Sequence, residues 1–371
     1  MRILHTADWQ IGKGFGRISG DAGALLREQR YTTVRRVAEL ATEHAVDVVL
    51  VAGDVFDSQT LPDAALRRTL EAMAGFTGAW VLLPGNHDAA LAESVWTRMA
   101  RLGVLPANVH PALHPEPLLF AGDRLAVLPA PLTRRHEPED LTEWFDAAST
   151  PPGAVRIGLA HGSVTNRLPE GAAAHNPIAD DRSERARLDY LALGDWHGTL
   201  EIAPRTWYAG TPETDGFRSR DPGHVLLVDV PEPGVSPTVT PLETTHYRWY
   251  QRHMSIGGAA DVDGLDARLS ALTDDPSRAL LRLTIDGSVD LAARAALDEV
   301  LARWQARLHY LEVDDAGLHP QASDADLAAF EGSGFVADAL AELRERQRAG
   351  EPHAADAIQR LYAAYQQLRE G

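Results

Sequence analysis

Short apolar runs alternate with longer amphipathic stretches over roughly the first 230 residues. Runs such as VDVVLVAGD and AWVLLPGNHD are almost continuously apolar, which is typical of strands buried on both faces. Residues 24–45, 61–74 and 91–102 carry apolar positions at helical spacing, which predicts helices. Strands that alternate with helices predict an α/β layered fold with a largely buried sheet.

The pattern changes after about residue 231. The stretch PEPGVSPTVTP is rich in proline and turn residues, which indicates a boundary. We therefore expect a first domain over 1–231, a small α/β domain over 245–318 and a helical tail over 323–371. The tail carries an apolar stripe that either packs within the chain or docks on a partner helix. The stripe consists of Ile358, Leu361, Tyr362, Tyr365 and Leu368.

Composition narrows the chemistry of any site. The chain of 371 residues has no cysteine, so disulfides and thiolate metal sites are excluded, and any metal is held by oxygen and imidazole. The net charge of −18 argues against a broadly basic surface that coats nucleic acid. It leaves room for a nuclease whose metal ions attract phosphate locally. No apolar run reaches membrane-spanning length and no secretory signal is visible, so we expect a cytoplasmic protein without a membrane partner.

Polar side chains stand where five of the predicted strands end. Ligands of layered α/β folds bind at the carboxyl ends of strands, so we expect these side chains to converge. Residues two apart on a strand point to the same side, which predicts that Asp195 and His197, and likewise Asp8 and Gln10, reach one point. Carboxylate, amide and imidazole groups suit Mn²⁺, Mg²⁺ and Fe²⁺, and the set is large enough for two metals. The residues are Asp8, Gln10, Asp54, Asp57, Asn86, His87, Asp88, His161, Asp195 and His197.

The ordered motifs carry a family resemblance. GDVFD, GNHD, a lone strand-end His-Gly and a Gly-x-x-His pair, in this order, resemble the calcineurin-like metallophosphoesterases. HTADWQIG at the N-terminus and the smaller lobe with its helical tail resemble, more narrowly, the SbcD-type DNA-repair exonuclease subunits. The catalytic motifs cover about residues 1–215, and beyond them the resemblance is architectural only. It implies an αββα β-sandwich flanked by helices, a smaller α/β second lobe and a helical tail.

The resemblance also implies a role for each motif residue. Asp54 would bridge two divalent metals, His87 would be the catalytic imidazole, and the carboxylate of Asp57 would orient that imidazole; a helix N-cap is the alternative for Asp57. The other implied ligands are Asp8, Gln10 and His197 for one metal, and Asn86, His161 and Asp195 for the other.

Two motif positions differ from the family pattern. The usual Asp-x-His is Asp8-Trp9-Gln10 here, and the usual Gly-His-x-His is Gly194-Asp195-Trp196-His197. The ligand set is therefore richer in oxygen, which favours Mn²⁺ or Mg²⁺ over Zn²⁺. Gln10 is either a weak ligand or an amide bonded to water.

The resemblance implies a DNA exonuclease, with endonuclease activity as an extension. Two metals would activate a water whose hydroxide attacks phosphorus. The second lobe would present DNA ends, the C-terminal helices would dock on an SMC-like coiled-coil ATPase, and a homodimer is a further expectation. The alternatives are a phosphoesterase for small phosphodiesters or phosphoproteins, and a degenerate scaffold subunit without catalysis.

Overall fold

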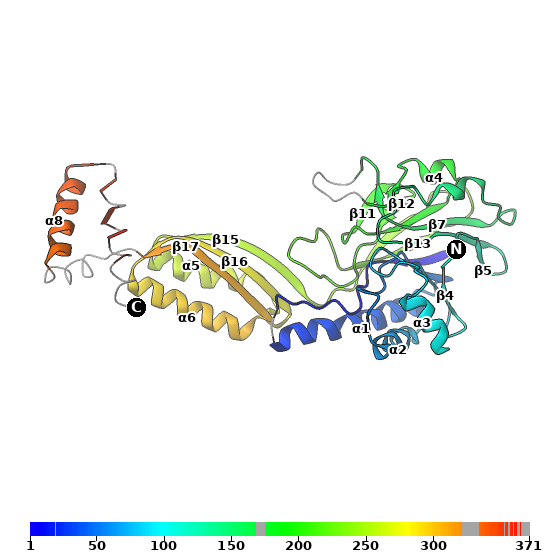
Figure 1. Ribbon diagram of the computed structural model, residues 1–371, viewed down its shortest axis with the longest axis horizontal. Helices are drawn as coiled ribbons and strands as arrows, with labels where there is room; N and C mark the ends of the chain where they lie inside the picture. The colour runs from blue at the N-terminus through cyan, green and yellow to red at the C-terminus, as the bar shows by residue number, and fades with distance from the viewer. Residues whose placement is uncertain are drawn as a thin grey trace. The chain divides into compact units, whose positions relative to one another are not determined.

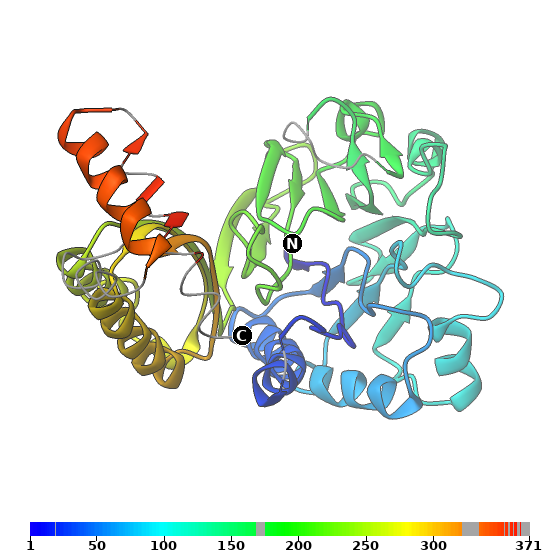
Figure 2. The ribbon, with the colours of Figure 1, turned by 60° about the vertical axis from the view of Figure 1, so that its left-hand side comes forward.

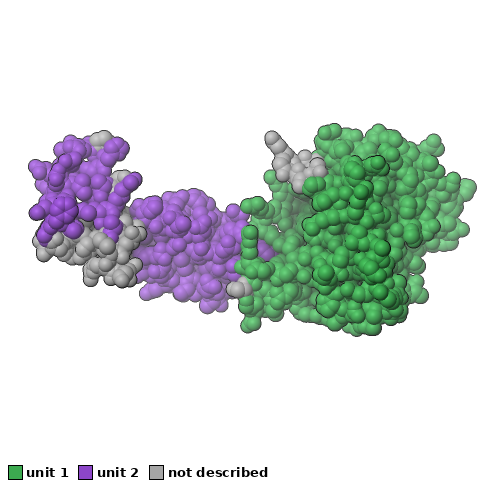
Figure 3. All heavy atoms as spheres, in the orientation of Figure 1, with its two compact units in different colours: residues 1–247 green, residues 248–371 purple. Residues whose placement is uncertain are grey.

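The chain forms two compact units, Met1–Tyr247 and Arg248–Gly371 (Figure 3). The computed structural model describes residues 1–18, 20–167, 175–320 and 334–351, and beyond them residues 353, 354, 357, 358, 360, 361 and 364. Each unit has a hydrophobic core of its own.

Two six-stranded sheets form the centre of the first unit. The first sheet contains β1 (Arg2–Thr6), β2 (Val48–Val51), β3 (Ala79–Leu82), β4 (Val109–Pro111), β13 (His224–Asp229) and β14 (Thr238–Glu243). The second contains β5 (Leu118–Phe120), β6 (Leu125–Ala130), β7 (Val155–His161), β10 (Tyr190–Gly194), β11 (Leu200–Ala203) and β12 (Thr206–Tyr208). Their orders are β14-β13-β1-β2-β3-β4 and β11-β12-β10-β7-β6-β5. A short pair, β8 (Ser163–Val164) and β9 (Pro177–Ile178), lies beside them.

Both faces of the first sheet are buried, which explains its continuously apolar strands. Alternate side chains of a strand point to opposite faces. Ile3 of β1 accordingly packs with Ile157 and Leu159 of the second sheet, whereas Leu4 packs toward the helices. These helices are α1 (Gly20–Glu43), α2 (Asp63–Met73) and α3 (Val95–Leu102), blue and cyan in Figures 1 and 2.

The outer face of the second sheet is covered as well. Leu128 and Leu191 pack there with Phe145 and Ala186, which belong to the short helix η1 (Glu143–Ala147) and the end of α4 (Arg182–Arg185). The first unit is thus a helix–sheet–sheet–helix sandwich, and the predicted αββα fold class is confirmed.

The predicted domain boundary near residue 231 is wrong. The proline-rich stretch contains the turn of a hairpin, because β14 pairs antiparallel with β13 from His224↔Glu243 to Asp229↔Thr238. The chain after β14 is also bound to the first unit. Glu213 accepts hydrogen bonds from the main-chain nitrogens of His246 and Tyr247, each at 2.9 Å, and from Thr33 of α1 at 2.8 Å. The first unit therefore extends to Tyr247.

The second unit contains a three-stranded parallel sheet of β15 (Arg248–Ile256), β16 (Ala279–Val289) and β17 (Tyr310–Pro320). Leu281, Leu283 and Ile285 share one buried face of β16, as predicted, and pack on α5 (Ala259–Ser270) and α6 (Leu291–Arg307). A short helix, η2 (Pro276–Arg278), precedes β16. The pattern did not predict β15.

The tail contains α8 (Phe335–Arg348). Leu340 of α8 packs with Ile358 and Leu361, so these two positions of the apolar stripe contribute to packing within the chain. Tyr362, Tyr365 and Leu368 lie outside the described residues. Among the residues described, no helix combines the length and apolar character needed to span a bilayer.

Candidate metal centre

The strand ends bring together side chains that lie far apart in the sequence. β1, β2 and β3 run parallel in one sheet, and β7 and β10 run parallel in the other. At their carboxyl ends Asp8, Asp54 and His161 are buried, and each offers a ligand atom within 4.8 Å of the other two. The predicted convergence of these three residues is therefore present in the structure.

The predicted residues lie in turns beyond the strands. β1 ends at Thr6 and β10 ends at Gly194, so strand alternation cannot explain why Asp8 faces Asp195. Asp8, Gln10, Asp54 and Asp195 instead have positive φ values of 51°, 49°, 52° and 99°. Non-glycine residues with positive φ are uncommon, and such strained backbone clusters at functional sites.

Two glycines allow the loops to approach one another. A Cβ added to Gly53, which has a φ of +92°, would lie 2.1 Å from Nδ1 of His161. A Cβ on Gly85 would lie 2.2 Å from Oδ1 of Asp54. The glycines of GDVFD and GNHD thus leave space for the functional side chains of neighbouring loops.

Asp8 is the meeting point on one side of the centre. The main-chain nitrogen of Asp195 donates to both carboxylate oxygens of Asp8 at 3.2 and 3.3 Å. Nε2 of His197 lies 4.0 Å from Oδ1 of Asp8. Asp195 also accepts a hydrogen bond from Ser163 Oγ at 3.1 Å. These contacts place Asp8, Asp195 and His197 around one volume.

Asp54 is the meeting point on the other side. Its Oδ1 accepts a hydrogen bond from the main-chain nitrogen of His87 at 2.9 Å, and its Oδ2 accepts one from Nε2 of Gln10 at 2.8 Å. Nε2 of His161 lies 3.6 Å from Asp54 Oδ1. The amide of Asn86 lies 3.1 Å from the same imidazole nitrogen and, with its nitrogen turned toward the carboxylate, donates to Asp54 at 3.0 and 3.1 Å.

His87 is oriented by main chain, which corrects the predicted role of Asp57. Nδ1 of His87 lies 2.9 Å from the backbone carbonyl oxygen of Asp57, so Nδ1–H donates to this carbonyl and the carboxylate of Asp57 takes no part in the bond. The alternative role as a helix N-cap is also wrong, since Pro62 precedes the first residue of α2. His87 consequently directs Nε2 away from Asp57.

The carboxylates of the centre raise one another's proton affinity. Burial raises the pKa of Asp8 to about 6; the nearby His197 and His161 oppose this shift, and Asp54 and Asp195 add to it. Burial lowers the pKa of His161, but the same three carboxylates outweigh burial and raise it to about 9. The centre therefore strongly attracts positive charge.

The donor set fits divalent cations. Three carboxylates converge on a buried imidazole whose Nδ1 lies 2.8 Å from the carbonyl of Ala52, and this bond leaves Nε2 facing the carboxylates. A cation would relieve the repulsion among them. Carboxylate, amide and imidazole ligands suit Mn²⁺ and Mg²⁺, and no thiolate is present to favour softer metals.

Two carboxylates that the sequence analysis left without a role support the loops. Asp88 accepts hydrogen bonds from the main-chain nitrogens of Gly85 at 2.7 Å and Phe56 at 3.0 Å, so it ties the GNHD loop to the GDVFD loop. Burial and the nearby Asp54 raise the pKa of Asp88 to about 8. The second carboxylate, Asp215, contacts His197 at 3.0 Å. GNHD made Asp88 visible in the sequence, whereas no motif pointed to Asp215.

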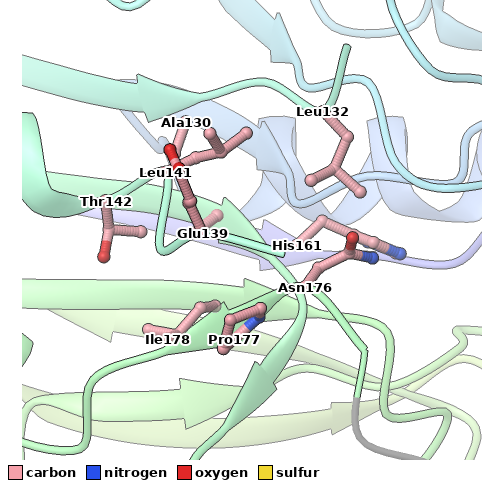
Figure 4. Close-up of a pocket in the computed structure, with 10 residues that line it drawn as sticks. Ala130, Leu132, Glu139, Leu141, Thr142, His161, Asn176, Pro177 and Ile178 are labelled. Carbon is pink, nitrogen blue, oxygen red and sulfur yellow. The ribbon is translucent and has the colours of Figure 1, made fainter. Parts of the chain in front are cut away.

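His161 also lines a small pocket of about 200 Å³ (Figure 4). The pocket is mostly apolar, with Leu132, Leu141 and Ile178 in its wall. His161 is the only one of the predicted ligands in that wall, so the ligand chemistry lies outside this pocket.

Gln10 provides a test of the altered first motif. We expect Gln10→His to bind Mn²⁺ more tightly than wild type, because imidazole is a stronger ligand than a neutral amide that already donates to Asp54. Histidine also tolerates the φ of 49° at this position. Isothermal titration with Mn²⁺ measures the change, and Gln10→Asn serves as the matched control. Equal affinity for Gln10→His and wild type would contradict the interpretation of Gln10 as a weak ligand.

Known proteins share these motifs. The chain is 24% identical over 335 residues to the uncharacterized metallophosphoesterase YhaO of Bacillus subtilis, covering 82% of this chain and 77% of that protein. It is 24% identical over 283 residues to the DNA double-strand break repair protein Mre11 of Aeropyrum pernix, covering 70% and 65%. Similarity to the SbcD component of the nuclease SbcCD of Escherichia coli is 39% but spans 99 residues, 25% of this chain and 23% of that component.

The family profile covers the whole set of motifs. The profile described as calcineurin-like phosphoesterase matches residues 1–197, which run from β1 to the last predicted ligand, His197. This match and the sandwich fold confirm the resemblance drawn from the ordered motifs. The chain belongs to the calcineurin-like phosphoesterase family.

Proposed function

We propose that the chain is a metal-dependent phosphodiesterase that digests DNA from its ends in repair or DNA-end processing, with Mn²⁺ as the preferred cation. The observation that carries the proposal is the buried set of Asp8, Asp54 and His161, whose ligand atoms lie within 4.8 Å of one another. The printed names of two relatives, a nuclease component and a break-repair protein, support DNA as the substrate.

The residues divide the chemistry between them. Asp8, Gln10 and His197 would hold one cation, Asn86, His161 and Asp195 a second, and Asp54 both. Divalent cations bound there supply Lewis acidity toward the phosphate and the attacking water.

His87 moves the proton to the leaving group. Its Nδ1 is held by the carbonyl of Asp57 at 2.9 Å, so Nε2 is the nitrogen that gives a proton to the leaving oxygen. General acid catalysis of this kind contributes about 10²–10⁴-fold to a rate.

The remaining parts of the chain extend the proposal. The second unit, from Arg248, would present DNA ends to the first, and the C-terminal helices would dock on an SMC-like coiled-coil ATPase. Packing of Leu340 on Ile358 supports a small helical element at this end of the chain. A homodimer and a location in the cytoplasm complete the proposal.

Digestion of end-labelled linear DNA and closed circular DNA with Mn²⁺ tests the substrate. We expect loss of label from linear DNA in wild type and no loss in Asp54→Asn. Cleavage of the circle as well would add endonuclease activity.

Two other outcomes would contradict a DNA nuclease. Cleavage of bis-p-nitrophenyl phosphate without any cleavage of DNA would identify a phosphodiesterase for small substrates, which the net charge of −18 favours over a DNA-coating protein. Binding of Mn²⁺ without cleavage of either substrate would indicate a scaffold subunit.

A further inference from the structure

Asp215 lies directly behind His197. Oδ2 of Asp215 is 3.0 Å from Nδ1 of His197, and Nε2 of the same ring is 4.0 Å from Oδ1 of Asp8. The imidazole therefore lies between a carboxylate outside the proposed ligand set and one inside it. A ring that donates Nδ1–H to Asp215 has its Nε2 facing the centre.

Asp215 is itself held in place from several directions. Its side chain is 3% exposed, Nζ of Lys13 lies 2.5 Å from Oδ2, and Nη2 of Arg30 lies 3.8 Å from the same atom. Ser219 donates to Oδ1 at 3.3 Å. Arg30 is fixed in turn by the main-chain oxygen of Trp9 at 2.6 Å. The carboxylate thus has both a defined orientation and positive charge beside it.

The ion pairs keep Asp215 ionised despite its burial. Burial by itself raises the pKa of Asp215, but His197, Lys13 and Arg30 together lower it well below the usual range. An ionised carboxylate can only accept hydrogen bonds, so Asp215 accepts from His197. Lys13, the single lysine of the chain, is thereby engaged in this network.

The chain path explains how a residue so distant in sequence reaches His197. After His197 the chain forms the hairpin of β11 and β12 and then returns. The nitrogen of Thr211 donates to the main-chain oxygen of His197 at 3.2 Å. This bond places the segment 211–215 beside the ring.

We propose that Asp215 is a positioning residue that fixes the tautomer and ring orientation of His197 so that Nε2 faces the cation. The proposal rests on the proposed metal centre. Histidine ligands commonly donate their second nitrogen to a carboxylate, and loss of such a partner typically costs about 10–100-fold in metal affinity. We expect a loss of this size for Asp215→Asn.

The test is titration of the full chain with Mn²⁺, by calorimetry or by the electron paramagnetic resonance signal of free Mn²⁺. Asp189→Asn is the matched control. Asp189 is a buried carboxylate that accepts hydrogen bonds from the main-chain nitrogens of Arg156 and Gly234 at 2.8 and 2.6 Å. It precedes β10, at the opposite end of that strand from the centre. We expect Asp189→Asn to bind Mn²⁺ as wild type does.

A double-mutant cycle separates positioning from charge. In a His197→Ala background Asp215→Asn should lose no further affinity, since the ring that Asp215 holds is absent. A general electrostatic effect of the lost charge, or a structural role of Asp215, would lower affinity equally in both backgrounds and would overturn the proposal. Wild-type affinity in Asp215→Asn would overturn it as well.

Two further readouts keep the result unambiguous. If Asp215→Asn does not fold, the cycle is run with Asp215→Glu, which keeps the charge for Lys13 and Arg30 but displaces the oxygen from Nδ1; the same criterion applies. Affinity that falls in the single variant while wild type leaves DNA uncut would refute the DNA proposal and support the role of Asp215. Absence of Mn²⁺ binding in wild type would refute both.

Discussion

Asp54→Asn should abolish phosphoester hydrolysis and the stabilisation of the fold by Mn²⁺ together. We expect turnover to fall by at least roughly 10³-fold, since Lewis acid stabilisation is worth several kcal/mol and about 4 kcal/mol corresponds to that factor. Asp54 has this weight because it contacts both Gln10 and the GNHD loop. It is the carboxylate best placed to serve both groups of ligands.

Asparagine is the informative substitution at this position. The φ of Asp54 is 52°, a conformation that asparagine tolerates and alanine does not. Asparagine also keeps one oxygen to accept a hydrogen bond from His87 or Gln10. The variant therefore removes the charge with little strain on the loop.

Thermal melting with and without Mn²⁺ gives the measurement. A ligand at about 100 times its Kd stabilises the folded state by about 2.7 kcal/mol, so wild type should melt at a higher temperature with Mn²⁺ and Asp54→Asn should not. Asp189→Asn, which lacks a buried carboxylate remote from the centre, should keep both the shift and the activity. Mn²⁺-dependent turnover in Asp54→Asn would refute the bridging role.

His87→Gln should separate catalysis from metal binding. We expect turnover to fall by about 10²–10⁴-fold, the range for loss of a general acid, while Mn²⁺ affinity stays near that of wild type. The side chain of His87 is bonded to the carbonyl of Asp57, and only its main-chain nitrogen contacts Asp54. Glutamine keeps that main-chain contact but has no group that titrates near neutral pH.

Steady-state kinetics on bis-p-nitrophenyl phosphate together with calorimetric titration measure the two quantities. His110→Gln is the control, because His110 is half-buried in β4 and packs against Phe120 at a ring-centroid distance of 5.3 Å. Its turnover should match wild type. A fall in Mn²⁺ affinity for His87→Gln as large as its fall in turnover would assign His87 to cation binding.

The convergence of Asp8, Asp54 and His161 could be predicted because it follows from strand order alone. Apolar runs mark buried strands, and parallel strands of one sheet end at the same edge. The local geometry was predicted wrongly for Asp8 and Asp195, because the period of a strand ends with the strand and the turns that follow have positive φ. Hydrophobic periodicity contains no information on these turns.

Long-range hydrogen bonds were equally invisible in the sequence. Asp215 lies in a loop without an apolar pattern, and only the return of the chain after β12 brings it to His197. The role of Asp57 depends on a carbonyl oxygen, which every residue possesses and no motif can mark. β14 was missed because proline and turn residues, typical of linkers, also form the turns of hairpins.

The bond between Glu213 and the end of the first unit limits where the chain can be shortened. A fragment that stops near residue 231 would lack β14 and the main-chain nitrogens of His246 and Tyr247. Glu213 is 2% exposed, and a buried carboxylate deprived of its donors costs about 1–3 kcal/mol or more for each lost bond. An excised catalytic fragment therefore has to retain Tyr247 to remain folded.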